Sequence, residues 1–145
     1  MVEEDIFQID TLLSALDNDN NSSIGDLTTA KIKTYKNNAL QKLQLSREEL
    51  KKMHKKLQDY RLVEELDDIQ YGHHIRWIRL TNPEKICLTN GGIICDIIVH
   101  NEQVHIRCFN RYRKIMQIKL DECYIFQKLS NQEKVILNVL DYLDK

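Results

Sequence analysis

The first third of the chain repeats its apolar residues with the period of an α-helix. Five apolar residues near the N-terminus recur at spacings of three and four, which places them on one helical face: Ile6, Ile9, Leu12, Leu13 and Leu16. The polar run 17–23 ends this helix, because its short side chains compete with the backbone for hydrogen bonds. A looser apolar repeat over 26–43 predicts a second helix.

Two further helices begin at the same start signal. Ser46 precedes Glu49, and Ser130 precedes Glu133, by the three residues of a capping box. The apolar stripes that follow are Leu50, Met53, Leu57 and Tyr60 after the first box, and Val135, Ile136, Val139, Leu140 and Leu143 after the second. The face opposite the first stripe is solvated or contacts an acidic partner or a phosphate, and it consists of Lys51, Lys52, Lys55 and Lys56.

Beyond Gly72 the pattern changes to the alternation of β-strands. Five short runs rich in β-branched and aromatic residues are separated by turn residues, at 74–80, 93–99, 104–109, 115–120 and 123–129. A chain this short has to protect its sheet edges, so we expect the strands to close, fully or half, into a small barrel. The predicted fold is therefore α+β, with N-terminal helices, a small five-stranded β-barrel and a C-terminal helix.

The change of period divides the chain into a helical part, 1–70, and a part, 71–145, that holds the barrel and the closing helix. Its charge changes at nearly the same point. Positions 1–72 carry 10 basic and 14 acidic residues, and positions 73–145 carry 11 basic and 8 acidic ones. Positions 1–26 hold seven acidic residues and no basic one. The whole chain is nearly neutral, which excludes a histone-like or polybasic protein.

The motifs of common catalytic and cofactor sites are missing from the sequence. It contains no Gly-rich phosphate loop, dinucleotide-binding turn, G-x-S-x-G nucleophile or H-E-x-x-H zinc helix. The four cysteines form no C-x-x-C pair, and His100 and His105 lack a third and fourth metal ligand. We therefore expect no catalytic residue, no cofactor and no metal, and free, buried thiols of an intracellular protein.

One cluster of residues favours contact with nucleic acid. Arg107, Arg111, Arg113 and Lys114 gather around a predicted hairpin tip, with Phe109 and Tyr112 between them. Basic side chains neutralise phosphates and exposed aromatic rings stack on unpaired bases. The alternative is a solvated loop whose arginines pair with nearby carboxylates. Arg76 and Arg79 on the first predicted strand would extend the basic patch, whereas Trp77 between them is expected in the core.

Helices followed by five short strands resemble SH3-like modules, the group that includes Tudor and KOW domains. The resemblance covers about residues 71–129 and rests on the order and length of the strands. It implies a non-enzymatic, SH3-like small barrel that binds peptides, proteins or nucleic acids. The candidates for a Tudor-type aromatic cage are Trp77, Tyr112, Tyr124 and Phe126.

The segment 71–78 and the later Gly91-Gly92-Ile93 are also similar to small uncharacterised proteins of large DNA viruses. The abundance of Ile, Lys and Asn fits the AT-rich genome of such a virus. This second resemblance implies a virion component or a factor used in infected cells.

Together these features predict a non-catalytic interaction or assembly protein. It would bind a partner protein or a second copy through its amphipathic helices and its barrel, with Trp77, Tyr124 and Phe126 as contacts. The alternative is a nucleic-acid-binding module that uses the hairpin residues Arg107, Arg111, Tyr112, Arg113 and Lys114. No apolar run reaches the roughly 18 residues of a membrane span. With no secretory signal in the charged residues 1–5, we expect an intracellular protein, in the host cytoplasm or the virion if it is viral.

Overall fold

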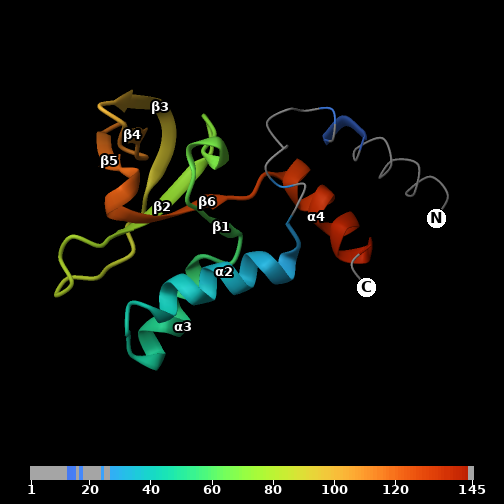
Figure 1. The fold of residues 1–145 in the computed structure, drawn as a ribbon, viewed down its shortest axis with the longest axis horizontal. Helices are drawn as coiled ribbons and strands as arrows, with labels where there is room; N and C mark the ends of the chain where they lie inside the picture. Colours follow the sequence, from blue (N-terminus) through green and yellow to red (C-terminus); the bar gives the residue numbers. More distant parts are fainter. Residues whose placement is uncertain (1–12, 16, 18–23, 25–26, 144–145) are drawn as a thin grey trace. The chain divides into compact units, whose positions relative to one another are not determined.

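The computed structural model describes residues 13–15, 17, 24 and 27–143, which form an α+β protein (Figure 1). The helices of this part include α2 (Thr29–Gln41), α3 (Arg47–Lys56) and α4 (Asn131–Leu143). The strands are β1 (Tyr60–Val63), β2 (His74–Arg79), β3 (Gly92–His100), β4 (Gln103–Phe109), β5 (Ile115–Lys119) and β6 (Cys123–Lys128), with 3₁₀ turns η2 (Leu66–Asp68) and η3 (Leu120–Glu122). The predicted α+β class and the C-terminal helix are confirmed. The first predicted stripe and the acidic segment 1–26 lie almost wholly outside the described residues.

The predicted capping box at Ser130 forms with both of its hydrogen bonds, and the one at Ser46 forms with the hydroxyl–amide bond alone. The Ser46 hydroxyl accepts a hydrogen bond from the Glu49 amide at 3.3 Å, and α3 follows directly. At the other box, the Glu133 amide donates to the Ser130 hydroxyl at 3.1 Å, while the Ser130 amide donates to the Glu133 carboxylate at 3.0 Å. Each box satisfies amides that a helix start leaves without a partner, which fixes where the helix begins.

The strands form one antiparallel sheet in the order β1-β6-β2-β3-β4-β5. The five predicted strands correspond to β2–β6, and β1 is a sixth strand that the sequence pattern assigned to the end of a helix. The sheet is not closed into a barrel, because β1 and β5 are the two ends of its order. The predicted small five-stranded barrel, closed or half-closed, is not confirmed: the sheet has six strands and is not closed.

β1 was missed because its sequence does not resemble that of a strand. It has only four residues, and Tyr60 continues the helical stripe that precedes it. Its Arg61 is buried, with its Nη2 3.4 Å from the Asp68 carbonyl and its Nη1 3.9 Å from the Asp68 carboxylate. Asp68 lies in η2, seven residues further along the chain. A buried charge such as that of Arg61 needs polar partners, and only the folded chain supplies them.

One face of the sheet carries the main core. Each strand contributes to a single buried cluster, from Val63 in β1 to Ile118 in β5, so the sheet curls around its own side chains. A β-bulge between Ile94 and Asp96 bends β3 and supports this curl. Gly92 permits the close approach of β4, because a Cβ there would lie 2.6 Å from the Phe109 carbonyl oxygen. The opposite face of the sheet packs Ile78 and Phe126 against α2 and α3.

The contacts group the chain into two compact units, Tyr35–Lys128 and Met1–Thr34 with Leu129–Lys145. The sequence division between residues 70 and 71 instead kept α4 with the strands. In the described part of the smaller unit, Ile24, Ile32, Ile136 and Leu137 share a buried cluster. The Asp141 carboxylate of α4 also accepts hydrogen bonds from the amide and the hydroxyl of Thr29, the first residue of α2.

Candidate functional site

The β4–β5 hairpin carries an unusual concentration of positive charge. The segment 103–119 contains no Asp or Glu, and its five Lys and Arg residues are Arg107, Arg111, Arg113, Lys114 and Lys119. Ile106 and Ile118 of the hairpin are buried in the core. Because successive side chains of a strand point to opposite faces, the residues next to Ile106 and Ile118 along β4 and β5 lie on the outer face of the hairpin.

The outer face of the hairpin consists of three cross-strand rows. His105 pairs with Lys119, Arg107 pairs with Gln117 and Phe109 pairs with Ile115. Neighbouring rows are two residues apart along each strand, or about 6.8 Å. Along the hairpin, the first row therefore holds ionisable or cationic side chains, the middle row holds one arginine, and the last row is apolar.

The middle row is held by hydrogen bonds between side chains. Arg107 Nε donates to Gln117 Oε1 at 2.9 Å, and Gln117 Nε2 lies 3.1 Å from His105 Nδ1. A guanidinium has only donors, so Arg107 fixes the Gln117 amide with its oxygen toward the arginine. The amide nitrogen then donates to His105 Nδ1, and the neutral imidazole carries its proton on Nε2.

The tip of the hairpin is an ordered turn with an exposed aromatic ring. Asn110 Oδ1 accepts hydrogen bonds from the Tyr112 amide at 2.9 Å and the Lys114 amide at 3.0 Å. The Tyr112 side chain is 74% exposed, and the Arg111 guanidinium carbon lies 4.9 Å from the centre of its ring. Arg113 has φ +60°, a left-handed conformation that most residues other than glycine avoid.

The basic residues of the tip have no carboxylate partner among the described residues. Within the part of the chain that the structure describes, Arg111, Arg113 and Lys114 form no ion pair. The described residues therefore do not show the carboxylate pairs that the alternative of a solvated loop expects for these three residues. The nearest acid to the middle row by strand register is Asp96, which lies opposite Arg107 on β3.

Apolar surface adjoins these cations. Ile115 is 65% exposed and its partner Phe109 is 37% exposed. Ile93 of β3 pairs with Phe109 from the other side, so the apolar row extends over three strands. We name the outer residues of the hairpin the hairpin surface: His105, Arg107, Phe109, Arg111, Tyr112, Arg113, Lys114, Ile115, Gln117 and Lys119.

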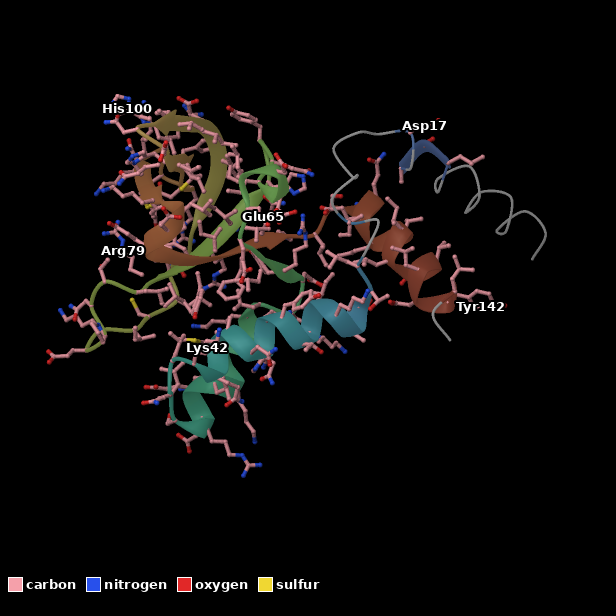
Figure 2. The ribbon with its side chains drawn as sticks, viewed as in Figure 1. Asp17, Lys42, Glu65, Arg79, His100 and Tyr142 are labelled. Atoms are coloured by element: carbon pink, nitrogen blue, oxygen red, sulfur yellow. The ribbon has the colours of Figure 1, made fainter. Side chains whose placement is uncertain are left out.

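A hollow of about 230 Å³ adjoins the first row of the hairpin surface. It lies where the ends of β2 and β5 meet η3 and the start of β6; Figure 2 labels Arg79 at the end of β2. Its polar lining comes from Arg79, His105, Gln117, Lys119 and Glu122. The predicted extension of the patch thus reaches the hairpin through Arg79. Arg76 is engaged elsewhere, because its Nε donates to the Thr89 carbonyl at 2.8 Å.

The three residues predicted to contact a partner protein are not gathered on a surface. Trp77 is 2% exposed and Phe126 is fully buried, so neither side chain is available to a partner in this fold. Trp77 packs in the inner cluster, whereas Phe126 and Tyr124 pack on the opposite face of the sheet. An aromatic cage built from Trp77, Tyr112, Tyr124 and Phe126 is therefore ruled out by their positions.

The cysteines form no disulfide, and they do not gather with the histidines into a metal site in the described part of the chain. All four cysteines are free; Cys87 and Cys95 are exposed, contrary to the expectation of buried thiols. Burial raises the pKa of Cys108 and of Cys123 to about 11, which keeps both thiols protonated at neutral pH. Among the described residues, no three His, Cys, Asp or Glu side chains are grouped closely enough to hold a metal ion.

Comparisons with known proteins give no further guide: no family model, no curated protein and no solved structure matches this chain. In the described part of the chain, none of the helices combines the length and the apolar character needed to cross a membrane.

The sequence pattern identified the hairpin tip but missed part of its surroundings. His105, Gln117 and Lys119 were not among the candidates, although they alternate with buried residues on the same two strands. The signal that would have found them is the absence of acidic residues over 103–119, combined with this alternation.

Proposed function

We propose that this protein is a non-catalytic binding module that binds nucleic acid through the hairpin surface. The observation that carries the proposal is an acid-free hairpin whose tip cations pair with no carboxylate that the structure describes and lie beside an exposed apolar row. Cations in this state attract phosphates, because each phosphate contact releases condensed counterions. The module would bind without catalysis, and inside cells, where its free thiols remain reduced.

The apolar row favours single-stranded over double-stranded ligands. A ring such as Phe109 or Tyr112 contributes to affinity when a base can stack on it, and the bases of a duplex are already stacked on one another. The ring of Tyr112 is exposed at the tip, while Phe109 lies two residues along β4 from Arg107. A strand crossing the hairpin would therefore meet bases on the rings and phosphates on the arginines.

The order of the strands supports the proposed relationship to SH3-like modules. β2 to β5 form a meander, η3 follows, and β6 returns to pair with β2. In this proposal β2–β6 are the five strands of a half-closed small barrel and β1 is an addition at its edge. The resemblance implies a non-enzymatic module that binds peptides, proteins or nucleic acids.

A second candidate function, protein assembly, is favoured by the end of α4. Tyr142 and Leu143 are neighbours, 75% and 71% exposed, and Val139 lies one turn before Leu143. Large apolar side chains gathered at one place on a surface are typical of protein contacts. A second copy or another protein could bury this end of the helix independently of the hairpin surface. Light scattering of the wild type and of Tyr142→Ser with Leu143→Ser tests this candidate.

Fluorescence anisotropy with labelled single- and double-stranded DNA and RNA tests the main proposal. The informative variant combines Arg111→Gln with Arg113→Asn, and the matched control combines Lys51→Gln with Lys55→Gln on the exposed face of α3. Both variants remove two positive charges from the same unit. Only the hairpin variant should lose affinity, and its salt slope should fall by about 1.4, or 0.7 for each lost contact with a single strand. Absence of binding at 50 mM salt, or equal losses in both variants, contradicts the proposal.

A further inference from the structure

The hollow beside the hairpin surface gathers hydrogen-bond donors from separate elements. Arg79 ends β2, His105 lies on β4, and Gln117 and Lys119 lie on β5. Arg79 is distant in the sequence from the other three, and the pairing of β4 with β5, the chain through η3 and the pairing of β6 with β2 bring them together. Three of the four can donate a hydrogen bond with positive or ionisable groups.

The charge around the hollow is only partly compensated. Lys119 forms an ion pair with Glu122 at 3.8 Å, but both side chains are more than 40% exposed and such pairs are weak. Arg79 forms no ion pair with any carboxylate that the structure describes. Arg79 therefore remains available to an anion, and Lys119 can exchange the Glu122 carboxylate for that anion.

The middle row of the hairpin surface prepares His105 for the same task. Arg107 orients Gln117, and Gln117 occupies His105 Nδ1, so Nε2 is the donor of the neutral ring. The ring is thus held in one tautomer by a residue that also lines the hollow. This connects the hollow to Arg107 by an unbroken series of hydrogen bonds.

We propose that the hollow lined by Arg79, His105 and Lys119 binds a phosphate group of the nucleic acid whose chain crosses the hairpin surface. Arg79 offers a planar fork of donors, which suits a phosphate, and Lys119 adds a point charge. The volume of about 230 Å³ exceeds that needed for a single phosphate, so the attached sugar can enter with it. The inference rests on the proposed function, and it applies to a terminal or to a backbone phosphate.

Oligonucleotides of one sequence distinguish these two sources in an anisotropy assay. They carry a 5′-phosphate, a 3′-phosphate or hydroxyls at both ends, and each is measured with the wild type, with Arg79→Gln and with the control Arg47→Gln. Arg47 is the exposed first residue of α3, and the helix α3 lies away from β4 and β5 in Figure 1. A terminal phosphate in the hollow should give about ten-fold tighter binding of one phosphorylated oligonucleotide, and Arg79→Gln alone should abolish that difference.

A backbone phosphate predicts a different result. All three oligonucleotides then bind alike, and Arg79→Gln lowers the salt slope by about 0.7 while Arg47→Gln does not. If Arg79→Gln leaves both the end preference and the slope as in the wild type, the inference is overturned.

A titration of the full chain with pyrophosphate, followed by NMR of the His105 imidazole, separates this inference from the proposed function. A shift of the His105 signals that Arg79→Gln removes, without binding of any oligonucleotide, supports the anion site and contradicts nucleic-acid binding. Oligonucleotide binding that Arg79→Gln does not affect, with no pyrophosphate shift, contradicts only the anion site.

Discussion

Replacing Arg113 by asparagine should raise the stability of the protein and lower its affinity for nucleic acid. Arg113 has φ +60°, and a residue with a branched or long side chain in this left-handed conformation costs about 1 kcal/mol. Asparagine adopts the same conformation more readily. The Arg113→Asn variant should therefore raise the free energy of unfolding by up to about 1 kcal/mol, because it relieves backbone strain without removing a buried contact.

The same substitution removes one of the five cations of the hairpin. If the Arg113 guanidinium contacts a phosphate of a single strand, the slope of log affinity against log salt should become shallower by about 0.7. Affinity at 50 mM salt should fall several-fold. A higher free energy of unfolding together with a lower affinity would show that Arg113 contributes to binding and not to folding.

A matched control exists in the turn at the other end of β4. Glu102 has φ +65° in the turn that joins His100 to Gln103, and Glu102→Asn relieves comparable strain while it removes an acid. Urea unfolding can follow the fluorescence of Trp77, the single tryptophan, which is 2% exposed. Both variants should be stabilised, and only Arg113→Asn should bind more weakly. Unchanged affinity in Arg113→Asn, or a loss of the same size in Glu102→Asn, refutes the reasoning.

Three further predictions concern charge, capping and pH. Neutralising acids near the N-terminus should tighten nucleic-acid binding measured by anisotropy, because seven acids without a base repel phosphate; changing side chains preserves the buried Ala15 and Ile24, which a deletion would remove. The substitutions are Glu3→Gln, Glu4→Gln, Asp5→Asn and Asp10→Asn. Asp141→Asn should destabilise the unit that contains α4 by about 1 kcal/mol, measured by hydrogen exchange of that helix, because Thr29 loses a charged acceptor at the N-terminus of α2. Burial, and then the charges of Lys128 and Arg76, lower the pKa of His74, so the unfolded chain takes up this proton first. Stability should therefore be complete above pH about 6.5 and decline as the pH falls toward 5, with a shallower decline in His74→Asn, measured by urea unfolding.

Local signals in the sequence predicted the elements, and contacts across the chain decided the rest. The two capping boxes and the alternating runs depend on neighbours within a few residues, and they located α3, α4 and the strands β2–β6. β1 could not be found in this way, because Arg61 is buried only when Asp68 and the sheet satisfy its polar groups. Whether the sheet closes likewise depends on its two ends, which no local pattern describes.

The candidate site shows the same difference between local signals and contacts across the chain. The cations of the tip lie within a few residues of one another, so composition alone identified them. The hollow combines Arg79 with His105 and Lys119 from other strands, and no spacing in the sequence indicates that they meet. Trp77 and Phe126 were candidates because aromatic residues often mark binding surfaces, but hydrophobic burial placed both in the core.

The alternation of β4 separates what holds the fold together from what is available for binding. Ile106 is fully buried, and its replacement by alanine should cost about 2–5 kcal/mol of stability. Phe109, on the outer face and 37% exposed, should cost much less when it is replaced by alanine. If a base stacks on its ring, however, Phe109→Ala should weaken single-strand binding by about 1–3 kcal/mol, a loss that salt does not change. Urea unfolding and anisotropy at two salt concentrations measure the two effects separately. A Phe109→Ala variant that is as unstable as Ile106→Ala, or that binds like the wild type, would show that the apolar row packs in the fold and contacts no base.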